Sequence, residues 1–477
     1  MMAQATAAKQ TGEISTEETV SGLIEKAREA MALFESHDQA RIDEAVTAIA
    51  WSLYRPESAK ALAELAVETT GLGNVPSKII KNQRKTFGTL RDLMRVRSTG
   101  IIEELPEKGL VKYAKPVGVV AAVTPSTNPS ATPVNKAMMA LKGGNAVIIA
   151  PSPMAWTATN ATIEAMRAEL AKVGAPRDLV QILPQPVTRE ATTALIGAAD
   201  LSVVTGSQNN VRRAYSSGKP AIGVGAGNAP VIIDASADLD DAAQMICASK
   251  IFDNATSCSS ENSLIILDEV YDEAIAALIR AGGYMASEDE GRRIVDLLWR
   301  DGNLNRHIIA KDASVLAQAF GLAGDAGSAK FFMVEETGIG AGHPLSGEKL
   351  SLVLTLYRAK DFADAKRIGS EILDHLGKGH SIGIHTANMD HARELAKDID
   401  VVRVLVNQAH TFGNGGGFNN GLPFTLTMGC GTWQGNSITD NLNYTCFLNI
   451  THLVTTIPED KPAEEDLFGG HWEKYGK

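Results

Sequence analysis

The segment VGVVAAVT at residues 117–124 decides the fold, because it is an uninterrupted apolar run too short for a helix and ends at a turn of Pro, Ser, Thr and Asn. Similar apolar runs follow at 146–149, 179–183, 201–204 and 221–224, and helical patterns lie between them at 130–142, 154–172, 188–198 and 208–217. Fully apolar strands that alternate with helices are typical of a parallel sheet covered on both faces. The sequence therefore predicts an α/β fold with a doubly wound parallel sheet.

The chain on either side of this sheet predicts further elements. Helical patterns precede it at 16–31, 38–54, 56–70 and 75–95, and two short strands at 99–104 and 110–115 read as a projecting ribbon. A second α/β region starts at 231–234, with later strands near 263–267, 330–334, 352–357, 381–385 and 402–406. A β-like run at 447–457 follows a long stretch (411–435) rich in Gly, Asn and Thr, and such a loop is expected to be functional.

Composition limits the possible functions. The chain has 477 residues, 44% apolar and 21% charged, and a net charge of −11, so nucleic acid is not an expected partner. There is no run of 18 apolar residues, and residues 1–15 are polar, so we expect neither a membrane span nor a signal peptide, and a disordered N-terminus. The four cysteines lack metal-type spacing, so no metal site is expected and a cytoplasmic protein is favoured.

The predicted sheet offers a site for a phosphate-bearing ligand. Ligands of such sheets bind at the carboxyl ends of the strands, which here are 124–129, 150–153 and 205–207. No GxGxxG fingerprint follows any strand, but Thr205-Gly206-Ser207 combines a strand end with a glycine and a hydroxyl at a helix N-terminus. Free N–H groups and the helix dipole favour a phosphate at such a position, although the same tripeptide is also a common cap without a ligand.

A single cysteine, Cys258, lies in the polar stretch FDNATSCSSE at residues 252–261. Buried structural cysteines usually lie among aliphatic side chains, whereas this one has hydroxyl and amide neighbours that could solvate a thiolate. The composition of the segment leaves two interpretations open, a nucleophile or a turn cysteine whose thiol is satisfied locally.

Several stretches together resemble the aldehyde dehydrogenase superfamily, and specifically its coenzyme-A-acylating branch. The resemblance spans residues 20 to 455 with the motifs in the expected order, listed here along the chain: 115–120, 124–129, 144–149, 205–207, 214–220, 225–230, the Cys-Ser-Ser-Glu at 258–261 and 348–351. It implies a cofactor domain (16–98 and 115–230), a catalytic domain (231–445), oligomerisation elements (99–114 and 446–460) and two tails (1–15 and 461–477).

The resemblance also implies roles for individual residues. Cys258 falls on the catalytic nucleophile and Asn128 on the amide that stabilises the oxyanion. Cofactor contacts are expected at Thr124, Pro125, Ala150, Ser152, Thr205, Gly206, Ser207, Gly225 and Glu348. His380 and Cys430 are candidate substrate contacts. The cofactor is NADP or NAD, since no acidic residue stands at 150–152 to reject a 2′-phosphate, and coenzyme A is the co-substrate.

One position separates the acylating from the hydrolytic enzymes. Hydrolytic members carry a glutamate as general base where Val224 stands here. A valine takes no proton, so attack of water on a Cys258 thioester is expected to be slow, and transfer of the acyl group to another thiol is favoured. The alternatives are a hydrolytic enzyme that uses another base and a cysteine acyltransferase without a nicotinamide cofactor.

The stretch 411–435 indicates the kind of aldehyde. Its amide, hydroxyl and backbone donors suit a small polar or anionic aldehyde. The resemblance to the acylating branch implies sulfoacetaldehyde first and succinate semialdehyde second. No arginine lies within the stretch, which leaves Arg403 on the preceding strand as a candidate for an anionic end. Glu261 could be a base, but a carboxylate paired with a nearby cation is the favoured interpretation. The ribbon and the run at 447–457 predict a homodimer or homotetramer.

Overall fold

A computed structural model describes residues 15–34 and 38–477, so most of the N-terminal tail expected to be disordered lies outside the described residues. Four helices come first: α1 (Thr16–Phe34), α2 (Gln39–Tyr54), α3 (Pro56–Thr70) and α4 (Val75–Met94). The Asp38 and Asn74 side chains accept backbone N–H bonds at the starts of α2 and α4. Gly71 ends α3 in the left-handed region, where its backbone N–H donates to the Val67 carbonyl oxygen.

The first sheet has five parallel strands in the order β5-β4-β3-β6-β7. Its strands are β3 (Val119–Thr124), β4 (Ala146–Pro151), β5 (Val180–Ile182), β6 (Leu201–Val204) and β7 (Ala221–Gly223), and its helices are α5 (Ala131–Lys142), α6 (Trp156–Lys172), α7 (Arg189–Ala198) and α8 (Gln208–Tyr215). Every residue of β3 and β4 is buried, which explains their unbroken apolar runs. The expected doubly wound sheet is confirmed.

The second sheet has seven parallel strands in the order β10-β13-β14-β9-β8-β15-β16. The strands are β8 (Ala229–Ile233), β9 (Glu261–Leu267), β10 (Gly283–Met285), β13 (Phe331–Glu335), β14 (Val353–Ala359), β15 (Gly379–His385) and β16 (Val401–Val406). The helices are α9 (Leu239–Ile251), α10 (Tyr271–Arg280), α11 (Glu288–Leu298), α12 (Ala313–Ala319), α13 (Phe362–His375), α14 (Met389–Asp398) and the short α15 (His410–Gly413). The sequence patterns missed β10 and the short hairpin β11 (Trp299–Arg300) and β12 (Asn303–Leu304).

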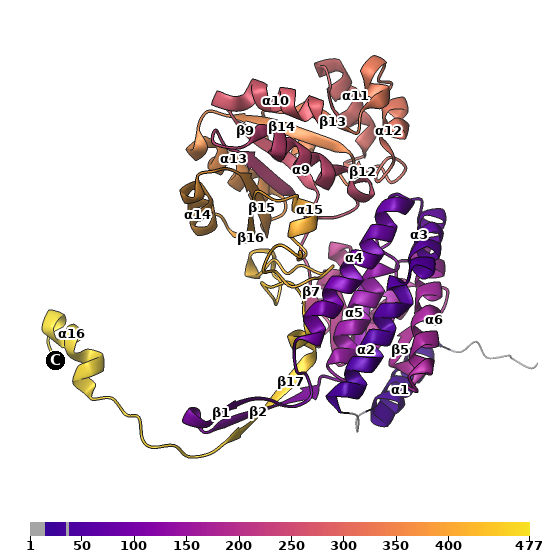
Figure 1. Cartoon of the computed structure of the whole chain (residues 1–477), viewed down its shortest axis with the longest axis vertical. Helices are drawn as coiled ribbons and strands as arrows, with labels where there is room; N and C mark the ends of the chain where they lie inside the picture. The colour runs from indigo at the N-terminus through magenta and orange to yellow at the C-terminus, as the bar shows by residue number, and fades with distance from the viewer. Residues whose placement is uncertain (1–14, 35–37) are drawn as a thin grey trace, which may run out of the picture.

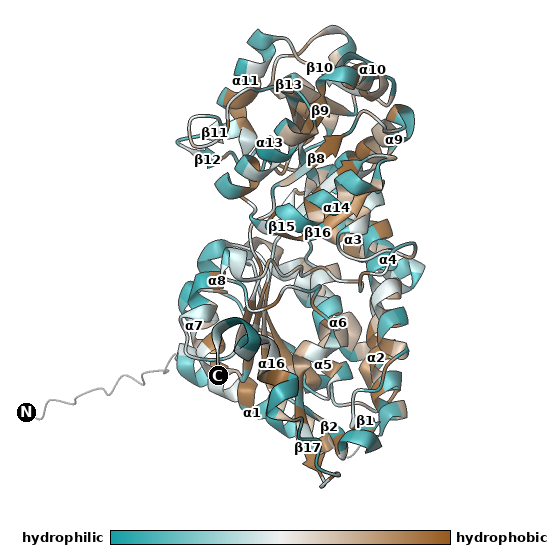
Figure 2. Ribbon diagram, turned by 90° about the vertical axis from the view of Figure 1, so that its left-hand side faces the viewer, coloured by the Kyte–Doolittle hydropathy of each residue, from teal (hydrophilic) through white to brown (hydrophobic). Residues whose placement is uncertain are grey.

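The two sheets belong to two lobes, with the stretch 411–435 between them (Figure 1). Figure 2 shows apolar strands inside each lobe and polar helix faces outside. A third, antiparallel sheet of β1 (Gly100–Leu105), β2 (Leu110–Pro116) and β17 (Leu448–Val454) projects from the lower lobe. Beyond it, α16 (Glu464–Tyr475), which the sequence did not predict, stands away from both lobes (Figure 1).

Candidate active site

A large cavity lies at the carboxyl ends of the first sheet. Its volume is about 740 Å³, and seven of the expected cofactor contacts line it together: Thr124, Pro125, Ala150, Ser152, Thr205, Gly206 and Ser207. The buried hydroxyl of Thr124 has no hydrogen-bond partner in the part of the chain that the structure describes. Four cations and no carboxylate line the cavity, the cations being Arg189, Arg213, Arg306 and Lys311. These donors and this charge fit a ligand with several phosphates.

The segment that carries Cys258 has a strained backbone. Asp253, Asn254 and Ala255, in the short helical turn Phe252–Ala255, have φ angles of 52°, 54° and 58°. A residue other than glycine in this left-handed backbone conformation costs free energy. It persists only where the neighbouring structure imposes it, which is most common at functional sites. The segment 225–230 lies directly against this cysteine. A Cβ added to Gly227 would lie 2.2 Å from the Cys258 carbonyl oxygen, so only a glycine allows this contact.

The Cys258 thiol is partly exposed but poorly solvated. Desolvation and, after it, the negative charges of Glu348 and Cys430 raise the pKa of Cys258 to about 12, against the smaller lowering effects of Ser259 and Arg403. The expectation that the hydroxyl neighbours would solvate a thiolate is therefore wrong for this conformation, because burial outweighs the contribution of Ser259. No described residue accepts a hydrogen bond from the Cys258 backbone N–H, which leaves that donor free for a ligand.

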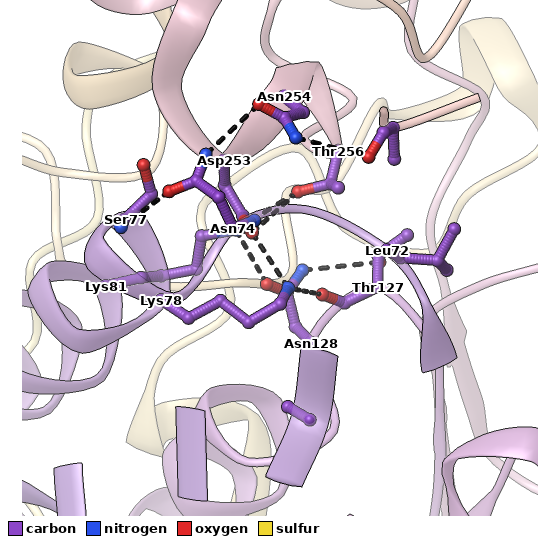
Figure 3. A network of polar contacts seen from close by, with 12 residues as sticks. Leu72, Asn74, Ser77, Lys78, Lys81, Thr127, Asn128, Asp253, Asn254 and Thr256 are labelled. Atoms are coloured by element: carbon purple, nitrogen blue, oxygen red, sulfur yellow. Dashed lines mark hydrogen bonds and ion pairs between the residues drawn. The ribbon is translucent and has the colours of Figure 1, made fainter. Parts of the chain in front are cut away.

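A buried ionic network binds the amide oxygen of Asn128 (Figure 3). The Lys81 ammonium donates to the Asn128 Oδ1 at 2.8 Å, to Thr256 at 3.3 Å and to the Asp253 carboxylate. Lys78 joins Asp253 at 3.0 Å and donates to the Thr127 carbonyl oxygen at 2.9 Å. Because Lys81 occupies the amide oxygen, the Asn128 amide nitrogen is the group left to face a substrate; its one described contact is a 3.4 Å bond to Thr127.

The network also anchors the strained segment. Asp253 is completely buried and accepts from Lys78, Lys81, Thr256 and the Asn74 backbone N–H. Burial alone raises the pKa of this carboxyl, but the two lysines and their hydrogen bonds bring it below its ordinary value. A buried carboxylate with these partners stays ionised, so α4 ties the Asn128 loop and the Cys258 segment to one charge.

The remaining expected contacts lie around Cys258 rather than in the large cavity. Desolvation raises the pKa of Glu348 to about 7, and no described residue makes an ion pair or hydrogen bond with its carboxyl group. Cys430 is fully buried, and a Cβ added to Gly225 would lie 3.0 Å from its sulfur. Gly225 thus packs against the 411–435 stretch and does not line the cofactor cavity.

The structure also places the candidates that the sequence left open. Buried His380 binds the Ser381 hydroxyl through Nδ1 at 2.7 Å, its Nε2 has no described partner, and burial lowers its pKa well below the ordinary value. Arg403 is buried and donates to Asn441 and to the carbonyl oxygens of His380 and Gly429, so it braces the stretch 428–441 from within.

Glu261 is likewise enclosed at the start of β9. Its carboxylate accepts hydrogen bonds from the Ser249 hydroxyl at 2.6 Å and from the His410 backbone N–H at 3.1 Å. Burial raises the pKa of Glu261 to about 7, although these hydrogen bonds and the charge of Lys250 act to lower it. This matches the interpretation of a structural carboxylate beside a cation.

Sequence reasoning missed the lysines of α4. Helix α4 buries Lys78, Lys81 and Lys85 on one face. The available signal was their spacing, i, i+3 and i+7, which puts three cations on one helical stripe. Hydrophobic periodicity alone reads such a stripe as the solvent side.

With two α/β lobes, a cysteine whose flanking serines share a pocket with a held asparagine, and a cavity suited to a phosphate-bearing ligand, the molecule has the features of a dehydrogenase with a cysteine nucleophile. The aldehyde dehydrogenase family profile matches residues 5–291. This match covers more than half of the chain, and the chain belongs to the aldehyde dehydrogenase family.

Individual relatives are closer still. The chain is 50% identical to the sulfoacetaldehyde dehydrogenase (acylating) of Cupriavidus necator, over 96% of this chain and 94% of that protein. It is 46% identical to the enzyme of the same name from Bilophila wadsworthia (96% and 100% covered). It is 38% identical to the succinate-semialdehyde dehydrogenase (acetylating) of Clostridium kluyveri (96% and 100% covered).

Solved structures agree with these relatives. The acetylating aldehyde dehydrogenase of Geobacillus thermoglucosidasius superposes with a TM-score of 0.90 at 34% identity, over 94% of this chain and 98% of that one. The propionaldehyde dehydrogenase of Rhodopseudomonas palustris, solved with bound CoA and an acylated cysteine, gives a TM-score of 0.82 at 26% identity (93% and 98% covered). An engineered glycolyl-CoA reductase with bound NADP⁺ gives 0.83 at 26% (93% and 98% covered). Among the described residues, no helix is long and apolar enough to cross a bilayer.

Proposed function

We propose that this chain is a coenzyme-A-acylating aldehyde dehydrogenase. It converts a small anionic aldehyde, best sulfoacetaldehyde, together with coenzyme A and NADP or NAD to the acyl-CoA thioester and the reduced cofactor, reversibly. The observation that carries the proposal is the pocket that Asn128 shares with Ser257 and Ser259, the two neighbours of Cys258, with Val224 in place of a carboxylate base. The names of the two relatives near 50% identity support sulfoacetaldehyde over succinate semialdehyde.

The reaction begins when the Cys258 thiol loses its proton to solvent and the thiolate sulfur bonds to the aldehyde carbon, while the carbonyl π electrons move to oxygen. The Asn128 amide nitrogen and the Cys258 backbone N–H hold this oxyanion, and one such donor is worth roughly 3–4 kcal/mol in comparable sites. When the oxyanion collapses, the carbonyl re-forms and a thioester remains on Cys258. A nicotinamide cofactor in the large cavity would supply the acceptor for the hydride that leaves the former aldehyde carbon.

The thioester is then transferred to the second substrate. The coenzyme A thiolate attacks the acyl carbon, and the Cys258 sulfur leaves, so that one thioester replaces another with little change in free energy. Val224 is 8% exposed and donates and accepts no proton, so no base for water stands at that position. The free carboxyl of Glu348 suits an acceptor for a ribose hydroxyl, and the cations of the large cavity suit the phosphates of either nucleotide.

The two lobes have different roles in this proposal. We assign cofactor binding to residues 16–98 and 115–230, and the nucleophile and aldehyde pocket to 231–445. The antiparallel ribbon leaves β17 as an edge strand with exposed Ile450, Leu453 and Val454, which suits pairing with a second copy of the chain. All four cysteines are unpaired, which suits a reducing compartment such as the cytoplasm.

The test is nicotinamide reduction by the purified protein with sulfoacetaldehyde, succinate semialdehyde and propionaldehyde, each with NADP or NAD and with or without coenzyme A. Turnover should require coenzyme A, should be fastest with sulfoacetaldehyde, and should vanish in Cys258→Ala. Equal rates without coenzyme A would instead identify a hydrolytic enzyme.

A further inference from the structure

A second, smaller pocket lies between α4 and the stretch 411–435, next to the Cys258 segment. Ser257 and Ser259, which flank the nucleophile, line it together with Asn128. Three cations of α4 also line it, Lys81, Arg84 and Lys85, and no carboxylate does. A substrate whose carbonyl lies between Cys258 and Asn128 would therefore extend toward a positively charged wall.

Two of the three cations already have partners. Lys81 is committed to Asn128 and Asp253, as described above. Lys85 is buried and donates to the Gly415 carbonyl oxygen at 2.7 Å. Desolvation and the charges of Arg84 and Lys81 lower the pKa of Lys85 to about 7, so this lysine carries only part of its charge near neutral pH.

Arg84 is different, because its guanidinium makes no hydrogen bond or ion pair with any described residue, and its Nε is a buried donor without a partner. The rings of Phe412, Phe418 and Phe424 surround it, with centroids 5.5, 5.2 and 5.7 Å from Cζ. Burial lowers the pKa of Arg84, but a guanidinium remains charged in proteins.

Arg84 is partly buried, so its cation loses part of its hydration without gaining an anion, and its planar donors match two oxygens of an oxyanion group. The three rings pack around the guanidinium, and its N–H groups have no partner among the described residues. The stretch 411–435, which contains no arginine, thus supplies the three aromatic rings around the guanidinium, and α4 supplies the positive charge.

We propose that Arg84 binds the anionic end of the aldehyde, a sulfonate carried one carbon from the carbonyl, with Lys85 as an auxiliary cation. This assignment rests on the proposed function and specifies which residue selects the substrate. It also replaces Arg403 as the candidate for that role, since Nη1 and Nη2 of Arg403 already donate to Asn441 and to the carbonyl oxygens of His380 and Gly429, and among its donors only Nε lacks a described partner.

The test compares Arg84→Gln with wild type on two aldehydes, sulfoacetaldehyde and the uncharged propionaldehyde. The ratio of their kcat/KM values should fall by about 10- to 100-fold, the range for hydrogen bonds to a charged group. Arg91→Gln is the matched control, because Arg91 also stacks on Phe418 and Phe424, at 5.2 and 4.9 Å, but pairs with Asp92 and lies outside this pocket. Its ratio should stay at the wild-type value.

A second measurement starts from the wild-type protein, so its main result does not depend on the folding of a variant. Ethanesulfonate should inhibit propionaldehyde oxidation competitively with the aldehyde, and Arg84→Lys should weaken this inhibition. The proposal is overturned if Arg84→Gln lowers kcat/KM equally for both aldehydes, or if ethanesulfonate does not compete with the aldehyde. A wild-type protein that oxidises no aldehyde with coenzyme A would refute the proposed function instead; ethanesulfonate binding by calorimetry, lost in Arg84→Gln, would then still uphold the anion site.

Discussion

At the scale of single residues, the site depends on a thiol whose environment opposes its ionisation. A Cys258 pKa of about 12 leaves about one thiolate in ten thousand thiols at pH 8. Part of this penalty comes from Glu348, whose own pKa of about 7 means that it is charged above neutral pH. The resting enzyme therefore protects its nucleophile from oxidation and alkylation, because the thiolate is the reactive form.

We predict that alkylation of Cys258 by iodoacetamide rises about tenfold per pH unit from pH 7 to pH 10 without a plateau, since below the pKa each unit of pH increase multiplies the thiolate fraction about tenfold. Glu348→Gln removes a negative charge that raises the Cys258 pKa, so it should accelerate alkylation at pH 9 but have little effect at pH 5.5, where Glu348 is already protonated. Peptide mass spectrometry would follow the site. A plateau below pH 8 in wild type would contradict this account.

At the scale of elements, α4 links the catalytic groups of both lobes. Its lysines hold Asn128 of the β3–α5 loop and Asp253 of the Cys258 segment, and Lys85 reaches the stretch 411–435. The sequence predicted α4 and the strands because helix starts and fully buried strands leave local patterns. It did not predict this bridge, because ion pairs such as Lys81–Asp253 join residues 172 positions apart and leave no periodic trace.

The same contrast explains the other outcomes. Thr124, Ala150 and Thr205 could be assigned to one cavity from the sequence, because parallel strands end at one edge of their sheet. The raised pKa of Cys258 and the lack of a partner for Arg84 depend on which distant side chains pack against these residues. The local sequence does not carry that information. Helix α16 stands alone and buries no residue, so the apolar periodicity that reveals packed helices is absent from it.

Lys81 and Lys78 provide a matched pair for testing the bridge. Each lysine pairs with Asp253, but only Lys81 also holds the Asn128 amide oxygen. We expect Lys81→Met and Lys78→Met to destabilise the protein similarly, by about 3–5 kcal/mol as for broken buried ion pairs. Only Lys81→Met should also lower kcat, by about 10- to 100-fold, because a released amide can turn its oxygen toward the substrate. Thermal unfolding and steady-state kinetics measure the two effects; equal kcat losses would contradict the assigned role of Lys81.

At the scale of the whole molecule, the ribbon and the lobes have separate tasks. The β1-β2-β17 sheet projects from the lower lobe, and β17 pairs with β2 alone along its length, from Leu448 opposite Pro116 to Val454 opposite Leu110 (Figure 1). Its outer edge offers unpaired backbone groups and exposed apolar side chains together, a combination that favours association.

We therefore predict that the wild-type protein is a dimer or tetramer, and that Leu453→Lys combined with Val454→Lys shifts it to a smaller species. Like charges placed on adjoining copies repel, and the apolar area lost there is what association would bury. Light scattering coupled to size exclusion gives the mass directly. A monomeric wild type, or an unchanged mass in the double variant, would contradict the assignment of β17.

The central claim is a long-lived thioester on Cys258 that coenzyme A, and not water, resolves. Its most direct test is intact-protein mass spectrometry after mixing the enzyme with sulfoacetaldehyde and NADP in the absence of coenzyme A. We predict that the mass rises by one acyl group, persists over minutes, returns to the starting value when coenzyme A is added, and does not change in Cys258→Ala. An adduct that never forms while the cofactor is reduced, or one that disappears in buffer as fast as with coenzyme A, would show that water takes the acyl group.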